Sequence, residues 1–157
     1  MKELTLKSTI KVAEFSELTD QERKLIEEAK ASTYKSYAPY SHFYVGAAIL
    51  LKNGVIVPGC NQENAAFPSG LCAERSAIFA AGAHYPDQPI MMLAIAERNE
   101  KGEFLEEPAS PCGSCRQVII ETETRFKQPV RILLYGTKFT YVMDGIKELM
   151  PLSFTEF

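Results

Sequence analysis

The sequence predicts one α/β domain over residues 1–157, in which a mixed β-sheet has helices packed on its faces. Three observations support this class. Helical segments alternate with short apolar strands along the chain. An Asn53-Gly54 turn joins two neighbouring strands as a hairpin. The length of 157 residues, with 46% hydrophobic and 24% charged residues, is typical of one globular domain with a sizeable core.

The N-terminal segment contains an extended stretch followed by a helix. Residues 1–17 are expected to form an N-terminal arm or an edge strand, because apolar and polar residues partly alternate over residues 3–12. Thr19 or Asp20 is suited to cap a helix predicted over residues 20–34, where apolar residues recur at helical spacing.

The middle of the chain combines the hairpin with a second helix. The hairpin strands are predicted over residues 43–51 and 55–60, and Cys60 is expected to be a small buried strand residue without a catalytic role. Residues 61–70 are rich in Asn, Pro and Gly and predict a loop. The alanine-rich stretch 72–83 predicts a helix that begins at a cysteine.

The C-terminal half continues the alternation of strands and helices. The prediction comprises strands over 90–96, 130–135 and 138–142, a polar loop over 97–110, a helix over 113–124, and a short helix over 145–150. Both cysteine clusters of the chain therefore fall at the N-termini of predicted helices, where the helix dipole favours a thiolate over a thiol.

The two clusters carry the chemistry. Cys72 in one cluster, with Cys112 and Cys115 in the other, can supply three thiolates to one zinc ion. Three protein ligands leave the fourth tetrahedral position open for water, which is typical of a catalytic zinc site. Unrelated cysteines in a reduced protein, or a structural zinc site, are the alternatives. A helix after each cluster and an adjacent glutamate favour catalysis.

Glu74 and Arg75 follow the first cysteine directly. Glu74 is placed beside the predicted metal without being a ligand, so it is suited to carry protons to a substrate ring nitrogen and to a departing amine. Arg75 is suited to donate hydrogen bonds to ligand sulfurs and so to offset the excess negative charge of three thiolates. Their structural alternatives are an ordinary first-turn glutamate and a solvent-facing arginine.

Composition excludes several classes of function. The formal net charge is -3 and the sequence has no dense Lys/Arg run, which disfavours a nucleic-acid partner. No apolar run approaches the roughly 20 residues that a membrane span needs. The first residues have no apolar segment of a signal peptide, so metal ligation explains the cysteines better than disulfides do. We therefore expect a cytoplasmic protein.

Four segments, in order, resemble the small cytidine deaminases of pyrimidine salvage, the homotetrameric type with three cysteine ligands to zinc. They are residues 40–48, 61–65, 72–75 and 111–117, which read YSHFYVGAA, NQENA, CAER and PCGSCRQ. The resemblance covers about residues 29–154. It implies a three-layer α/β/α sandwich around a mixed five-stranded sheet. It also implies zinc-dependent hydrolytic conversion of cytidine and 2'-deoxycytidine to uridine and 2'-deoxyuridine, with release of ammonia.

The resemblance also implies roles for individual residues. Cys72, Cys112 and Cys115 would hold one zinc per chain, Glu74 would be the proton shuttle, and Arg75 would support the ligands. The implied substrate-binding residues are Phe43, which walls the base pocket, Asn61 and Glu63, which bind the ribose, the backbone of Ala73, which contacts the pyrimidine, and Phe154. The implied partners are a small nucleoside and three further copies of the chain, with the active sites at subunit interfaces.

Two questions stay open at this stage. Phe154 can complete a neighbour's pocket or pack on its own chain, and the sequence does not separate ribose from deoxyribose preference. The alternative enzyme is a deaminase of nucleoside antibiotics of the blasticidin S type, which shares the three-cysteine site. A non-catalytic zinc protein is a third reading, which Glu74 argues against because structural zinc sites have four protein ligands.

Overall fold

The structure, a computed structural model, describes residues 1–155. In that range six strands form one mixed sheet in the order β1-β6-β5-β4-β2-β3. The strands are β1 (Lys11–Ala13), β2 (Tyr44–Leu51), β3 (Ile56–Cys60), β4 (Ile90–Arg98), β5 (Arg131–Tyr135) and β6 (Thr140–Met143). The α-helices are α1 (Asp20–Ser32), α2 (Ala73–His84) and α3 (Gly113–Phe126), and short 3-10 turns are η1 (Phe15–Glu17), η2 (Thr33–Lys35), η3 (Phe67–Ser69) and η4 (Ile146–Glu148).

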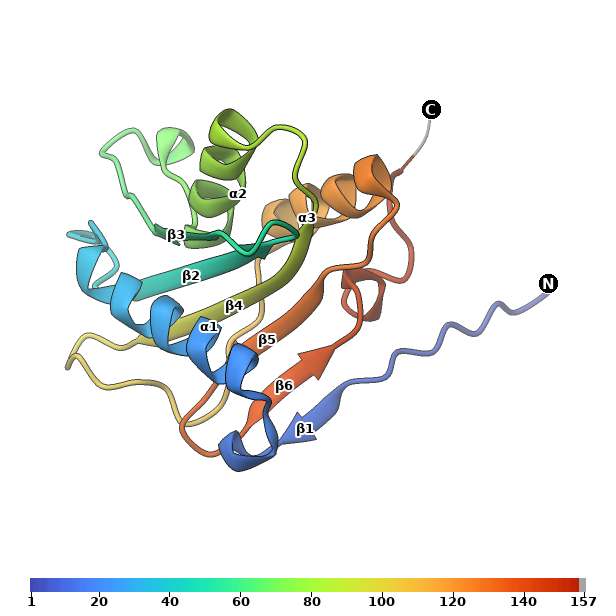
Figure 1. Cartoon of the computed structure of the whole chain (residues 1–157), viewed down its shortest axis with the longest axis horizontal. Helices are drawn as coiled ribbons and strands as arrows, with labels where there is room; N and C mark the ends of the chain where they lie inside the picture. The colour runs from blue at the N-terminus through green and yellow to red at the C-terminus, as the bar shows by residue number, and fades with distance from the viewer. Residues whose placement is uncertain (156–157) are drawn as a thin grey trace.

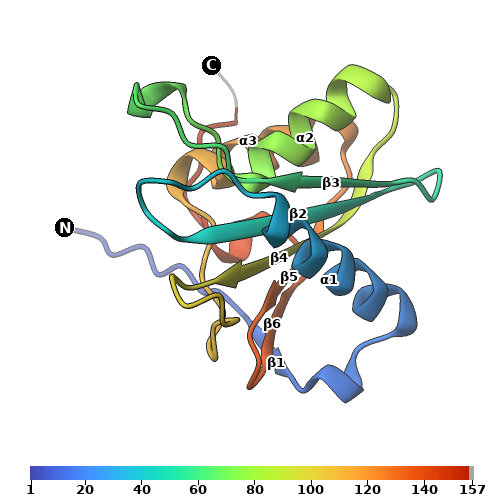
Figure 2. The same cartoon turned by 90° about the vertical axis from the view of Figure 1, so that its left-hand side faces the viewer.

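The sheet lies between two layers of helix, which confirms the predicted α/β/α class. Helix α1 covers one face, and α2 and α3 cover the other (Figures 1 and 2). Leu25 and Ile26 of α1 belong to the core on the first face, whereas Ala77 of α2 and Ile119 of α3 belong to the core on the second. Only β4 and β5 pair in parallel, and the other neighbouring strands pair antiparallel.

The strand count corrects the sequence-based expectation, because the described sheet has six strands where five were expected. The sixth is β1, which joins the free edge of β6 with Lys11 opposite Val142. Residues 1–10 have no regular secondary structure and run outward from the sheet (Figure 1). The backbone N–H of Thr9 donates to the Glu148 carboxylate at 2.5 Å. The N-terminal segment is thus both an arm and an edge strand.

Strand β4 is longer than expected, since the sequence predicted a strand over 90–96 and a loop from Glu97 onward. The strand continues to Arg98 because β2 supplies backbone partners for two further residues. Val45 lies opposite Glu97, and Tyr44 lies opposite Arg98. The extension places a carboxyl group in a buried strand, where the sequence analysis expected a solvated loop.

The hairpin and the first helix confirm their local signals. Gly54 has a φ of +85°, which glycine adopts without strain, and Asn53 Oδ1 accepts from the Val55 N–H at 3.1 Å. Thr19 caps α1 in a reciprocal capping box with Glu22. The predicted short helix over 145–150 is the 3-10 turn η4.

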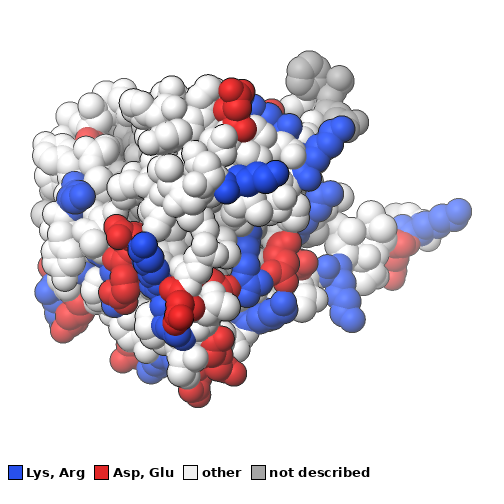
Figure 3. Space-filling view, in the orientation of Figure 1, with Lys and Arg blue, Asp and Glu red and all other residues white. Residues whose placement is uncertain are grey.

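Charged side chains of both signs are mixed on the face shown in Figure 3, over α1 and the N-terminal arm, rather than forming a continuous basic groove there. Over α2 and β3 the same face is largely uncharged. None of the helices described in residues 1–155 is long and apolar enough to cross a membrane.

Candidate active site

The N-termini of α2 and α3 converge on the same side of the sheet. Cys72 is the N-cap residue of α2, and Cys112 is the N-cap residue of α3. The first turn of α2 lies very close to β3 at Gly59. A Cβ built on Gly59 would lie 2.5 Å from the Ala73 carbonyl oxygen, so only glycine allows this approach. The close packing fixes where the first cysteine lies relative to the sheet.

The three cysteines that the two helices bring together form a compact thiol cluster. Cys72 Sγ lies 3.7 Å from Cys112 Sγ, which lies 3.5 Å from Cys115 Sγ. Zinc–sulfur bonds of about 2.3 Å in tetrahedral geometry place the sulfurs about 3.8 Å apart, so these spacings fit a zinc ion. All four cysteines are free of disulfides, and Cys60, half-buried at the end of β3 rather than buried as expected, lies outside the cluster.

The cluster stabilises negative charge on sulfur. A hydrogen bond from Cys115 and another from Arg75 lower the pKa of the Cys72 thiol to about 5. Arg75 Nη2 lies 3.7 Å from Cys72 Sγ. The pKa of Cys115 is raised, because its proton is held in the bond to Cys72 and because it is buried. A metal ion would displace the thiol proton, whereas Arg75 could continue to donate to the Cys72 sulfur.

A cavity of about 670 Å³ adjoins the thiol cluster and the loop after β3. Cys72, Cys112 and Glu74 belong to its lining. Glu74 is only 4% exposed, and this burial raises the pKa of its carboxyl group. A buried carboxyl group with a raised pKa, beside a thiol cluster, is suited both to accept and to donate a proton.

The cavity lining also includes polar groups from the loop after β3. Asn61 holds the start of β2, since its Oδ1 accepts from the Val45 N–H at 2.9 Å and its Nδ2 donates to the Phe43 carbonyl at 2.8 Å. Glu63 accepts from the backbone N–H of Tyr40 at 2.8 Å and of Ser41 at 3.3 Å. Hydrogen bonding with Ser41 is the main cause that lowers the pKa of Glu63. Each side chain retains hydrogen-bonding capacity for hydroxyl groups of a ligand.

The remaining predicted residues lie in different places. Phe43 lines the cavity. Ala73 is fully buried. It is the first residue of α2, so its backbone N–H has no partner within the helix. Phe154 does not line the cavity and is 64% exposed. Its carbonyl accepts from Gln117 Nε2 of α3 at 2.8 Å, which ties the C-terminal segment to that helix.

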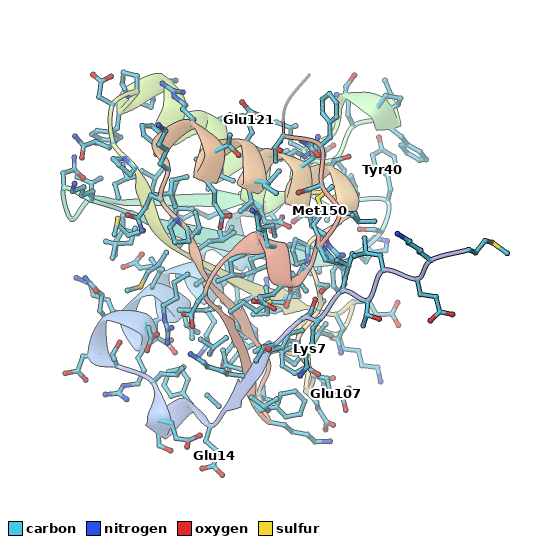
Figure 4. All side chains as sticks on the ribbon, turned by 90° about the vertical axis from the view of Figure 1, so that its right-hand side faces the viewer. Lys7, Glu14, Tyr40, Glu107, Glu121 and Met150 are labelled. Atoms are coloured by element: carbon cyan, nitrogen blue, oxygen red, sulfur yellow. The ribbon has the colours of Figure 1, made fainter. Side chains whose placement is uncertain are left out.

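Two exposed aromatic residues belong to the lining of the cavity. Tyr40, labelled in Figure 4, packs edge-to-face on Phe67 of η3, with ring centres 5.5 Å apart. Both rings line the cavity and remain 48% and 72% exposed, respectively. Exposed aromatic rings at the entrance of a pocket are typical of a surface that is covered by a ligand or a partner.

Glu97 is the residue of the cavity that the sequence analysis missed. It is 3% exposed, and its Oε2 has no hydrogen-bond partner among the described residues. Burial, followed by the charge of Glu74, raises the pKa of Glu97 to about 8. The alternation of side chains along a strand could have indicated this position. Leu93 and Ile95 face the α2–α3 side of the sheet, so the next residue on that face is Glu97.

This buried carboxyl group predicts a pH-dependent stability. Its pKa is higher in the folded chain than its ordinary value of 4.5, so the folded state retains a proton that the unfolded state releases. Stability is therefore full below about pH 4.5 and falls until about pH 8. We expect Glu97→Gln to match the wild type at pH 4.5 and to unfold about 10 °C higher at pH 8.5, since about 5 kcal/mol is at stake.

Thermal unfolding of the zinc-loaded protein by circular dichroism measures this difference. Glu121→Gln is the matched control, because Glu121 is an exposed carboxylate on α3 (Figure 4) and its loss is expected to leave the pH profile unchanged. A Glu97→Gln profile parallel to that of the wild type would contradict the buried, proton-binding state of Glu97.

The fold and the site define the class: an α/β/α domain with a three-thiol metal centre at the end of a ligand-sized pocket. Residues 19–128 match the family described as the cytidine and deoxycytidylate deaminase zinc-binding region. The chain belongs to this family. The family's zinc-binding description agrees with the fit of Cys72, Cys112 and Cys115 to one zinc ion.

Individual relatives agree with this assignment. The chain is 39% identical over 131 residues to a cytidine deaminase of Halalkalibacterium halodurans, an alignment covering 83% of this chain and 92% of that protein. It is 44% identical over 98 residues to a cytidine deaminase of Sporosarcina psychrophila, covering 62% and 67% of the two chains.

Solved structures show the same fold. A crystal structure of cytidine deaminase from Burkholderia pseudomallei matches with a TM-score of 0.73 at 36% identity, covering 87% of this chain and all of that one. The cytidine deaminase of Mycobacterium tuberculosis matches with a TM-score of 0.67 at 30% identity, covering 88% and 99% of the two chains.

Proposed function

We propose that the chain catalyses the hydrolytic deamination of cytidine and 2'-deoxycytidine to uridine and 2'-deoxyuridine, releasing ammonia, as an enzyme of pyrimidine salvage in the cytoplasm. The observation that carries the proposal is the lining of the cavity, which combines a thiol cluster and a buried carboxyl group with the polar side chains of Asn61 and Glu63. Membership of the deaminase family supports the same reaction.

The proposed metal centre consists of one zinc ion held by Cys72, Cys112 and Cys115. When bound, zinc lowers the pKa of a coordinated water into the neutral range and so supplies a nucleophile for C4 of the base. Arg75 offsets the charge of three thiolates by donating to the Cys72 sulfur. Helix termini at Cys72 and Cys112 contribute in the same direction, because their dipoles favour anionic ligands.

Glu74 is the proposed proton carrier. Burial raises its pKa above the ordinary value of a glutamate, which helps the carboxyl group to hold a proton between transfers. It accepts one proton from the attacking water and passes it to N3 of the pyrimidine. It then takes the second proton from the C4 hydroxyl group and delivers it to the departing amine. The C4–N bond breaks as the C4–O bond becomes a carbonyl, so water and cytidine yield uridine and ammonia.

Asn61, Glu63, Phe43 and the Ala73 backbone are the proposed contacts to the nucleoside. Asn61 and Glu63 bind hydroxyl groups of the ribose, Phe43 packs against the base, and the Ala73 N–H donates to the pyrimidine. These contacts orient the base, and orientation lowers the barrier to reaction at C4. Asn61 and Glu63 line the same cavity as Cys72 and Glu74, so one nucleoside can contact both groups.

Asn61→Ala is expected to lower kcat/KM for cytidine at least about tenfold, because it removes ribose contacts and loosens the start of β2. Steady-state kinetics on cytidine and on free cytosine measure the effect, since only the nucleoside uses the ribose contacts. Asn53→Ala, in the β2–β3 turn, is the matched control and should retain wild-type kinetics. Unchanged cytidine kinetics in Asn61→Ala would remove the ribose assignment.

The proposed assembly is a homotetramer with active sites at subunit interfaces. Two features support it: the aromatic entrance formed by Tyr40 and Phe67 is exposed, and so is the ring of Phe154. A small nucleoside needs a water-poor pocket, and a neighbour's side chain can close an entrance that this chain leaves open. We propose that Phe154 supplies that side chain.

A subunit-mixing experiment tests the role of Phe154. Glu74→Ala chains, which retain Phe154, are combined with Phe154→Ala chains, which retain Glu74, under conditions that allow exchange. If Phe154 acts across the interface, some mixed sites regain both groups, and activity rises above the sum of the separate variants. No gain on mixing, with Phe154→Ala alone impaired but assembled, would place its action within its own chain.

The function itself is tested by ultraviolet monitoring of the purified protein with a panel of substrates. We expect turnover of cytidine and deoxycytidine, and little of cytosine or dCMP. Cytosine lacks the ribose, and dCMP carries a phosphate, whereas the one Lys or Arg among the described lining residues, Arg75, is directed at the Cys72 sulfur. Blasticidin S is the decisive comparison. Faster turnover of the antibiotic than of cytidine would favour the alternative enzyme.

A further inference from the structure

Glu97 is a buried carboxyl group that the proposed mechanism leaves without a role. Its side chain lies at the end of β4, in the wall of the cavity, and is 97% inaccessible to solvent. Its Oε2 makes no hydrogen bond within the described chain. An unsatisfied buried carboxyl oxygen costs free energy, and such a group persists where a ligand supplies the missing partner.

The neighbours of Glu97 place it near Glu74 and the second cysteine cluster. The charge of Glu74 acts on it directly, and the backbone N–H of Ala109 approaches it. Ala109 and Ser110, which also line the cavity, immediately precede the second cysteine cluster. Val45 lies opposite Glu97 across the β2–β4 pair and fills the same wall with an apolar side chain. Among the described residues, no side chain donates a hydrogen bond to Glu97 Oε2.

The cytosine base offers one matching group. Its hydrogen-bonding edge has two acceptors, N3 and O2, and one donor, the exocyclic 4-amino group. This amino group is attached to C4, the carbon that reacts in the proposed mechanism. A carboxylate is the protein group that accepts hydrogen bonds from this amine. In uracil the same position carries a carbonyl oxygen, an acceptor that an ionised Glu97 repels and a protonated Glu97 would bind, so the discrimination is greatest above the Glu97 pKa of about 8.

We propose that Glu97 is a substrate-positioning residue whose Oε2 accepts a hydrogen bond from the 4-amino group of cytosine and so discriminates cytidine from uridine. The inference rests on the proposed function and adds a specificity determinant to it. Glu97 and Glu74 then flank the departing amine from two sides. Binding the substrate more tightly than the product keeps the pocket available as uridine accumulates.

Equilibrium binding in an inactive background tests the inference. Glu74→Gln blocks turnover and is the parent, to which Glu97→Met or Glu97→Gln is added. Methionine fills the same volume without an acceptor, whereas glutamine retains an acceptor oxygen. Calorimetric titrations of the zinc-loaded proteins with cytidine and with uridine are made at about pH 9, where an ionised Glu97 is an acceptor only.

We expect the parent to prefer cytidine to uridine, and Glu97→Met to lose at least about fivefold in cytidine affinity without losing uridine affinity. Glu97→Gln should keep the cytidine affinity of the parent within about threefold, because its amide oxygen replaces the acceptor. A parent without preference, or equal losses for both nucleosides in Glu97→Met, would overturn the inference. If the wild type did not deaminate cytidine, the proposed function would fail first, and that result is separate from the binding ratio.

Discussion

Glu74→Gln is expected to lower kcat for cytidine by about 10⁴-fold or more, while the fold and the zinc content stay unchanged. General acid–base catalysis typically contributes about 10²–10⁴-fold, and Glu74 is assigned several proton transfers in one turnover, so its loss should reach the upper end. The glutamine keeps the size and the hydrogen-bonding shape of the carboxyl group but carries no titratable proton. Burial of Glu74 makes solvent a poor substitute carrier.

Steady-state ultraviolet assays of wild type and variant, each with measured zinc content, provide the comparison. Glu121→Gln serves as the control, because it changes an exposed glutamate on α3 in the same way. A Glu74→Gln enzyme that retained more than about a tenth of the wild-type kcat would make Glu74 a bystander on this scale.

Single substitutions of Cys72, Cys112 or Cys115 by alanine are expected to abolish both zinc binding and activity. Two remaining thiolates leave zinc without the three protein ligands of a catalytic site, and metal binding contributes to folding stability as well. Cys60→Ala is the matched control, since Cys60 lies outside the thiol cluster and its sulfur donates to the Lys35 carbonyl at 3.3 Å.

Elemental analysis of the purified variants measures the zinc content per chain. We expect one zinc per chain in the wild type and in Cys60→Ala, and strongly reduced zinc in the other three. Full occupancy in all three cluster variants would exclude the assigned ligand set.

Local signals made most of the fold predictable. The Asn53-Gly54 turn sets its own conformation, and the capping box of Thr19 and Glu22 marks the start of α1 within the few residues that form it. The cysteine spacing was similarly informative, because Cys72 and Cys112 begin helices that the sequence itself indicates. Features encoded over a few neighbouring residues can be predicted without knowledge of the tertiary structure.

Features that depend on distant pairing could not be predicted in this way. Strand β1 exists because β6, more than 120 residues later, offers a free edge, and Lys11 lies opposite Val142. Arg98 was expected in a loop, yet it donates to Thr33 Oγ1 at 2.8 Å from the end of β4 and stacks on Tyr34. Glu97 was missed for the same reason, since only pairing with β2 turns its carboxyl group into the cavity wall.

The central claim is that water attacks C4 of cytidine at this site and that ammonia leaves. Incubation of the zinc-loaded protein with cytidine in oxygen-18 water, followed by mass spectrometry of the nucleoside and an ammonia assay, tests it most directly. We expect uridine carrying one oxygen-18 atom at C4 and an equal amount of ammonia, with neither formed by Glu74→Gln on the same time scale. Recovery of unchanged cytidine, or of uridine without the label, would contradict it.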